Sequence, residues 1–139
     1  MYTAVTKWVD GFQFVSKSPS NHSIVMDAGG LETGQNSAPT PMELMLMGLG
    51  GCAGIDVVTI LQKQKYRIDS FTVETKGERV DDHPRIFSKI WVTYRVKGNV
   101  TPDALEKAAV MSAEKYCSVG AILKKSAEVV YSYEIVTSD

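Results

Sequence analysis

The feature that most constrains this chain is a long apolar segment that begins with a complete set of helix-start signals. Thr40 supplies an N-cap, Pro41 stands in the first turn, and Glu43 closes a capping box three residues after the threonine. Residues 44–49 then place apolar side chains on every side of a helix. We therefore expect a helix that runs to about Lys63 and lies inside a core, because no face is offered to water.

Within this helix, a cysteine is surrounded by glycines. Segment 48–54 reads Gly-Leu-Gly-Gly-Cys-Ala-Gly, with the cysteine at Cys52. Each glycine costs about 0.8–1 kcal/mol relative to alanine in a helix, so the pattern needs a reason. Close helix packing around a small buried thiol would give one, and space for a substrate beside the thiol would give another.

The second cysteine, Cys117, lies where another predicted helix breaks and a short one begins. A helix start, with Lys115 two residues away, is a setting that lowers the pKa of a thiol. A buried apolar role would explain the residue equally well. Any disulfide between the two cysteines would depend on the tertiary fold, which their spacing does not reveal.

Glu43 has a structural role in the capping box, and its position also bears on Cys52. Nine helical residues place the two side chains roughly 13.5 Å apart along the axis and on opposite sides of the helix. Unless the glycines break the helix, Glu43 can serve Cys52 only from a second chain. A shared site would therefore require a dimer.

Other chemistry-bearing residues give weaker signals. Asp56 lies one turn after Cys52 on the same face, where a carboxylate would raise the pKa of the thiol. His22 and His83 are isolated from one another and from any cysteine pair, so we expect no metal site. The glycine-rich segment 48–54 has no preceding strand and matches no nucleotide-binding motif, so we expect no cofactor.

The remaining pattern predicts one α+β domain over residues 1–139. Asp10-Gly11 is a hairpin signal, residues 31–38 form a polar loop, and Thr101 caps a second helix with a stripe that includes Ser112. Alternating or apolar runs predict six strands, at residues 2–9, 12–16, 23–26, 67–77, 86–97 and 129–136. The order βββ-α-ββ-α-β lacks regular βαβ alternation, so we expect antiparallel sheets.

The net charge and the amino-terminal sequence argue against several classes of partner and location. The net charge of −1 gives no general attraction to phosphate, so we expect no nucleic-acid partner and no polybasic membrane docking. The amino terminus lacks the pattern of a signal peptide. The twelve uncharged residues between Glu43 and Asp56 fall short of the roughly 18–20 needed for a bilayer. We expect a cytoplasmic protein.

Several segments together resemble the OsmC/Ohr family, the osmotically inducible and organic hydroperoxide resistance proteins. Residues 39–44 (PTPMEL) leading to 50–52 (GGC), and residues 114–119 (EKYCSV), are similar to the two cysteine motifs of the family. Residues 83–90 (HPRIFSKI) resemble the OsmC-like subgroup. The resemblance implies an intertwined homodimer in which β-sheets wrap around two central helices, with active sites at the subunit interface.

The resemblance also implies a chemistry, the thiol-dependent reduction of organic hydroperoxides. By motif, Cys52 matches the peroxidatic cysteine, Cys117 the resolving cysteine and Glu43 the active-site glutamate. An external dithiol or a thioredoxin-like reductant would reset the disulfide. Met42 separates Pro41 from Glu43, and no arginine precedes Arg67. These departures motivate an alternative, a non-catalytic or differently catalytic homodimer that binds a small molecule.

Overall fold

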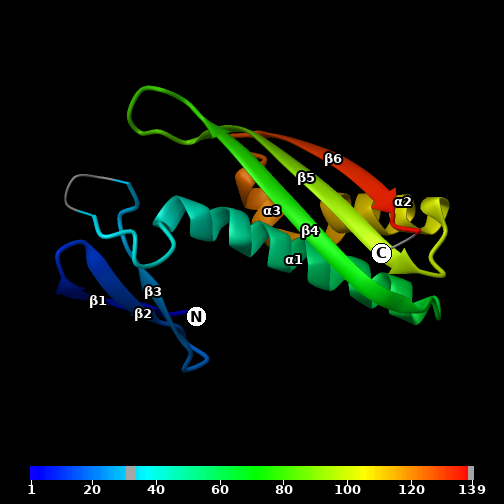
Figure 1. Cartoon of the computed structure of the whole chain (residues 1–139), viewed down its shortest axis with the longest axis horizontal. Helices are drawn as coiled ribbons and strands as arrows, with labels where there is room; N and C mark the ends of the chain where they lie inside the picture. The colour runs from blue at the N-terminus through cyan, green and yellow to red at the C-terminus, as the bar shows by residue number, and fades with distance from the viewer. Residues whose placement is uncertain (31–33, 138–139) are drawn as a thin grey trace. The chain divides into compact units, whose positions relative to one another are not determined.

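A computed structural model describes residues 1–30 and 34–137 and confirms the predicted α+β order. The chain divides into two compact units, Met1–Met45 and Leu46–Asp139. The elements, labelled in Figure 1, are β1 (Val5–Asp10), β2 (Gln13–Lys17), β3 (Ser23–Met26), α1 (Pro41–Lys63), β4 (Ile68–Arg79), β5 (Phe87–Gly98), α2 (Pro102–Met111), the π-helical turn η1 (Ser112–Tyr116), α3 (Ser118–Leu123) and β6 (Glu128–Ile135).

The first unit contains an antiparallel sheet in the order β1-β2-β3. Its first turn is the predicted hairpin: Gly11 has a φ of +54°, and its N–H is held by Asp10 Oδ1 at 2.9 Å. Of the predicted loop 31–38, residues 31–33 lie outside the described residues and 34–38 are irregular. Ser37 donates both its hydroxyl and its N–H to the buried Asp27, which holds the pKa of that carboxyl below its ordinary value.

The second unit contains a sheet in the order β4-β5-β6, and here one prediction is wrong. Strands β4 and β5 are antiparallel, as expected, but β5 and β6 are parallel, with Lys89 opposite Glu128 and Val96 opposite Ile135. The reason is the connection between them. A crossover through α2, η1 and α3 returns the chain to the end at which β5 began, so β6 runs in the same direction.

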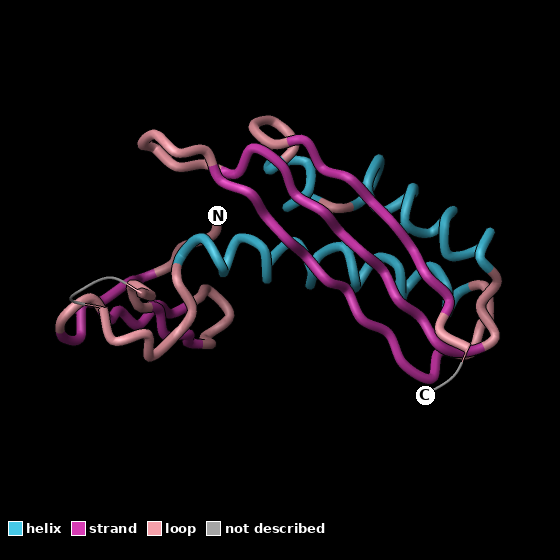
Figure 2. Tube along the Cα trace, turned by 45° about the horizontal axis from the view of Figure 1, so that its top comes forward, coloured by secondary structure: helices cyan, strands magenta, loops and turns pink. Residues whose placement is uncertain are grey.

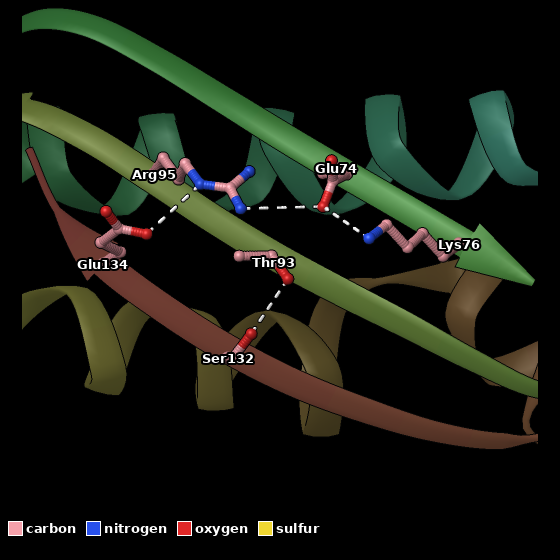
Figure 3. A network of polar contacts seen from close by, with 6 residues as sticks. All are labelled: Glu74, Lys76, Thr93, Arg95, Ser132 and Glu134. Atoms are coloured by element: carbon pink, nitrogen blue, oxygen red, sulfur yellow. Dashed lines mark hydrogen bonds and ion pairs between the residues drawn. The ribbon is translucent and has the colours of Figure 1, made fainter.

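The two faces of this sheet differ, as the alternation in β5 predicted. Ile90, Val92, Tyr94 and Val96 are fully buried. The helices α1, α2 and α3 lie against one face of the sheet (Figures 1 and 2). The other face carries a polar network drawn in Figure 3, in which Arg95 contacts Glu74 at 3.7 Å and Glu134 at 3.3 Å.

Helix α1 is continuous over 23 residues, so the glycines do not break it. Within one chain, however, only one stripe of the helix is buried, formed by Leu49, Ala53, Gly54, Val57 and Leu61. Met47 and Ile55 are 57% and 69% exposed. One sheet and a few short helices cover one side of α1, so the expectation of a core on all sides is not met by a single chain.

Candidate functional site

Cys52 lies half-buried in the middle of α1, and its glycine neighbours do two different things. At Gly54, a Cβ would lie 3.3 Å from Val73 Cγ2, so this glycine allows close packing of α1 on β4. At Gly48 and Gly51, a Cβ would meet nothing within 4 Å. Close packing and open space, the two reasons offered for the glycine pattern, therefore apply to different sides of the same helix.

An apolar groove of about 400 Å³ runs along α1 next to this segment. It is bounded by α1 on one side and by β4 on the other. Its lining consists of Gly50, Gly51, Gly54, Ile55, Val58, Thr59, Phe71 and Val73. Cys52 itself does not line this groove, which lies on the face of α1 that its own chain leaves open.

Cys117 is buried at the break between η1 and α3. Its N–H donates to Ser112 O at 2.8 Å and so closes the π-helical turn, and its Sγ accepts the N–H of Gly120 at 3.3 Å. The helix break was predicted, but the lowered pKa was not found. Burial raises the pKa of the Cys117 thiol to about 11, and the Gly120 N–H offsets only part of this effect.

The fold brings the two cysteines together. Both are free thiols, and Cys52 lies close enough to Cys117 to help raise the pKa of the Cys117 thiol. Burial is the main cause of the raised pKa, and the negative charge of Asp56 adds a smaller effect. One thiol comes from the central helix and the other from the helix break, which the spacing in sequence could not reveal.

Polar side chains that sequence reasoning did not assign to a site surround the thiol pair. Ser112 is fully buried, and its hydroxyl donates to Asp56 Oδ2 at 2.8 Å. Tyr94 and Tyr131 have buried hydroxyls without a well-formed hydrogen bond among the described residues. Burial raises the pKa of both tyrosines, and the charge of the Cys117 thiolate raises it further. A serine within an otherwise apolar helical stripe was the one available signal for this cluster.

Glu43 occupies the capping box that the sequence predicted. Its Oε1 accepts the N–H of Thr40 at 2.9 Å, and its own N–H donates to Thr40 Oγ1 at 3.2 Å. The hydrogen bonds from Thr40 lower the pKa of the Glu43 carboxyl. Because α1 is unbroken between Glu43 and Cys52, a catalytic role for Glu43 still requires a second chain.

Within residues 1–30 and 34–137, no three or more His, Cys, Asp and Glu side chains form a group that could hold a metal ion. Among the described helices, α1 alone is long and apolar enough to cross a membrane, with a mean hydropathy of 1.9. These criteria concern length and composition, and the core helix of a soluble protein also meets them.

By its fold and its thiols, this chain is an α+β protein with one cysteine on a central helix and a second at a helix break. The family described as OsmC-like protein matches residues 34–132. The chain therefore belongs to the OsmC-like family, as the sequence motifs predicted. In this fold, α1 is the core helix of a soluble domain.

Individual relatives extend the match over the whole chain. Protein YhfA of Escherichia coli K12 is 42% identical over 136 residues, which cover 97% of this chain and 98% of that protein. A hypothetical protein from Aquifex aeolicus VF5 is 32% identical and has a TM-score of 0.87, with 100% and 98% of the two chains covered. The organic hydroperoxide resistance protein OsmC from Legionella pneumophila shares the fold, with a TM-score of 0.73 at 14% identity and 96% and 98% coverage.

Proposed function

We propose that this protein is a thiol-dependent peroxidase that reduces organic hydroperoxides through a disulfide cycle of Cys52 and Cys117. The observation that carries the proposal is that the fold places the two thiols, which come from different elements, near enough for Cys52 to affect the pKa of Cys117. Two neighbouring thiols can form a disulfide without a large rearrangement. The name of the Legionella structural relative, an organic hydroperoxide resistance protein, supports the same reaction class.

The proposed cycle begins at Cys52, the less buried thiol. Its thiolate attacks the distal peroxide oxygen, the O–O bond breaks, and the alcohol leaves after taking up a proton. The resulting sulfenic acid is attacked by Cys117: the S–S bond forms, the S–O bond breaks, and hydroxide leaves as water with the Cys117 proton. An external dithiol or a thioredoxin-like protein then reduces the disulfide.

The apolar surroundings of Cys52 within α1 support an organic substrate rather than hydrogen peroxide. Leu46 and Leu49 precede Cys52 in the helix and Ile55 follows it, and such side chains offer an alkyl or aryl group contacts that displace water. Hydrogen peroxide has no apolar part to use such contacts.

We further infer a homodimer in the cytoplasm, with the chain acting as one OsmC-like domain. Exposed large apolar side chains occur in both compact units, including Trp8 and Phe12 in the first and Met47, Ile55 and Ile122 in the second. A second copy would cover such surfaces. It would also bring a second Glu43 within reach of Cys52, as the geometry of α1 requires for a shared site.

Turnover experiments test the proposed activity. With dithiothreitol as reductant, we expect the wild type to consume cumene hydroperoxide at least tenfold faster than hydrogen peroxide. Cys52→Ser removes the attacking sulfur and should abolish turnover. Cys117→Ser should lose most of the turnover and accumulate a sulfenic acid that dimedone labels. Equal turnover by the wild type and Cys52→Ser would contradict the proposal.

One observation favours the alternative of a small-molecule binder with other or no catalysis. The pKa of Cys117 is raised by burial, as in a structural thiol, and the sequence offers no arginine before Arg67. The rate of Cys52 alkylation between pH 5 and pH 9 separates the two functions. A rate already at its plateau at pH 7 supports catalysis, whereas a rate that still rises steeply at pH 9 supports the binder.

A further inference from the structure

Ser112 and Asp56 form a buried link between the two cysteine-bearing segments. Ser112 begins η1, and its hydroxyl donates to Asp56 Oδ2 at 2.8 Å, while its carbonyl accepts the N–H of Cys117 at 2.8 Å. Asp56 lies on α1 one turn after Cys52. Through one serine, the position of Cys117 is therefore tied to the helix that carries Cys52.

The link is of a strong kind. A hydroxyl that donates to a carboxylate makes a charge-assisted hydrogen bond, which is stronger than one between neutral groups. The serine side chain is fully buried, whereas Asp56 is half-buried, so the donor is shielded from water more completely than the acceptor. A π-helical turn is rare, and this one ends at Tyr116 with Cys117 as its C-cap. The contact of its first residue, Ser112, with Asp56 therefore helps to fix where Cys117 lies.

We propose that Asp56 and Ser112 are positioning residues of the redox site: their hydrogen bond holds Cys117 beside Cys52. This role rests on the proposed thiol cycle. Neither residue reacts with peroxide. They act through Cys117, whose proton leaves as part of water when the disulfide closes.

Every element packed around Cys117 contributes to its charge environment. Helix α1 presents Cys52 and Asp56, β5 presents Tyr94, and β6 presents Tyr131. Lys124 lies over the Tyr131 ring at 5.5 Å, but it donates to a backbone carbonyl, that of Ala113. The Gly120 N–H donates to the Cys117 sulfur and acts in the opposite direction, because it lowers the pKa of this thiol. The negative charge of Asp56 therefore acts in the same direction as burial and opposes the thiolate.

Two variants separate the hydrogen bond between Ser112 and Asp56 from the charge of Asp56. Ser112→Ala removes the donor and leaves the charge of Asp56. Asp56→Asn removes the charge but keeps an oxygen that can accept from Ser112. A matched control is Ser132→Ala, the same chemical change at a serine that pairs with Thr93 at 3.0 Å on the exposed face of the sheet (Figure 3).

The full-length variants are equilibrated with mixtures of reduced and oxidised dithiothreitol, and the Cys52–Cys117 disulfide is quantified by intact mass. We expect Ser112→Ala to lower the equilibrium constant for disulfide formation about tenfold, which is about 30 mV for two electrons. We expect Asp56→Asn, which keeps an acceptor for Ser112, to lower this constant by less than Ser112→Ala does. Ser132→Ala should leave it unchanged.

The outcomes are distinguishable. A Ser112→Ala equilibrium equal to that of Ser132→Ala would overturn the positioning role, even if hydroperoxide still oxidises the pair. If Ser112→Ala does not fold, Asp56→Ala decides in its place because it removes the acceptor of Ser112, and an equilibrium equal to that of Ser132→Ala would overturn the positioning role. Because no hydroperoxide is used, a disulfide that forms here but not with hydroperoxide contradicts only the proposed function. A wild type that forms no disulfide in any mixture would overturn both.

Discussion

At the scale of single residues, the environment of Cys117 fits the proposed cycle, in which two neighbouring thiols stay reduced until a peroxide arrives. Burial raises the pKa of Cys117 to about 11, so this thiol is protonated and a poor nucleophile at neutral pH. Cys52 is the more accessible of the two. In the proposed cycle, the difference in burial favours Cys52 for the first attack and Cys117 for the second, the order that the family motifs imply.

The raised pKa also predicts how stability depends on pH. A thiol with a higher pKa in the folded than in the unfolded state stabilises the fold while protonated, and this contribution is lost as pH rises. The pKa of Cys117 rises from an ordinary value of 9.0 to about 11 in the folded state. The free energy of unfolding should therefore fall by about 2 kcal/mol between pH 9 and pH 11. Urea unfolding of the reduced protein over this range measures it.

The matched control for this prediction is Cys117→Ser, which keeps the two buried tyrosines but has no thiol to ionise. We expect the wild type to lose more unfolding free energy than Cys117→Ser between pH 9 and pH 11. Parallel pH profiles for the two proteins would show that Cys117 does not ionise in this way.

At the scale of elements, α1 carries both Cys52, the proposed attacking thiol, and a face that its own chain leaves uncovered. Its buried stripe, with Leu49, Val57 and Leu61, packs within the second unit. Met47 and Ile55 remain exposed, and a Cβ at Gly51 meets nothing in the chain. Glycine in an open helix position is unfavourable by about 0.8–1 kcal/mol relative to alanine. A twin helix that approaches closely would explain why glycine stands there.

Gly51→Ala tests this explanation through the sign of its effect. If the chain folded alone, alanine would stabilise α1 by about 1 kcal/mol. With a second α1 against Gly51, we expect destabilisation instead, and we expect Gly51→Leu to abolish the dimer and folding. Urea unfolding and sedimentation velocity at micromolar concentration check both variants. A stabilised Gly51→Ala, or a folded wild-type species of about 15 kDa, would contradict the dimer.

At the scale of the whole molecule, the sequence predicted those features that depend only on residues close together in the chain, such as turns and helix caps. The capping box at Thr40 and Glu43, the Asp10-Gly11 hairpin and the helix cap at Thr101 all formed as the sequence indicated. The parallel pairing of β6 was missed because strand direction depends on where a crossover ends. The contact of Ser112 with Asp56 was missed because it joins residues 56 positions apart.

The proposed homodimer also depends on contacts that lie outside any local segment, because it rests on apolar surface that a single chain leaves exposed. One chain buries only part of α1 and leaves apolar side chains exposed in both compact units. An obligate dimer that covers such surfaces buries over roughly 2,000 Å² in total. The family match over residues 34–132 and the near-complete coverage of Protein YhfA support one OsmC-like fold for the chain.

The intact mass of the reduced wild type after one equivalent of cumene hydroperoxide tests the central claim most directly. The two-thiol cycle predicts the loss of two hydrogens per chain, with a disulfide between Cys52 and Cys117 in the peptide map. Cys117→Ser should instead gain one oxygen at Cys52. A wild type whose mass and two free thiols remain unchanged would contradict the account.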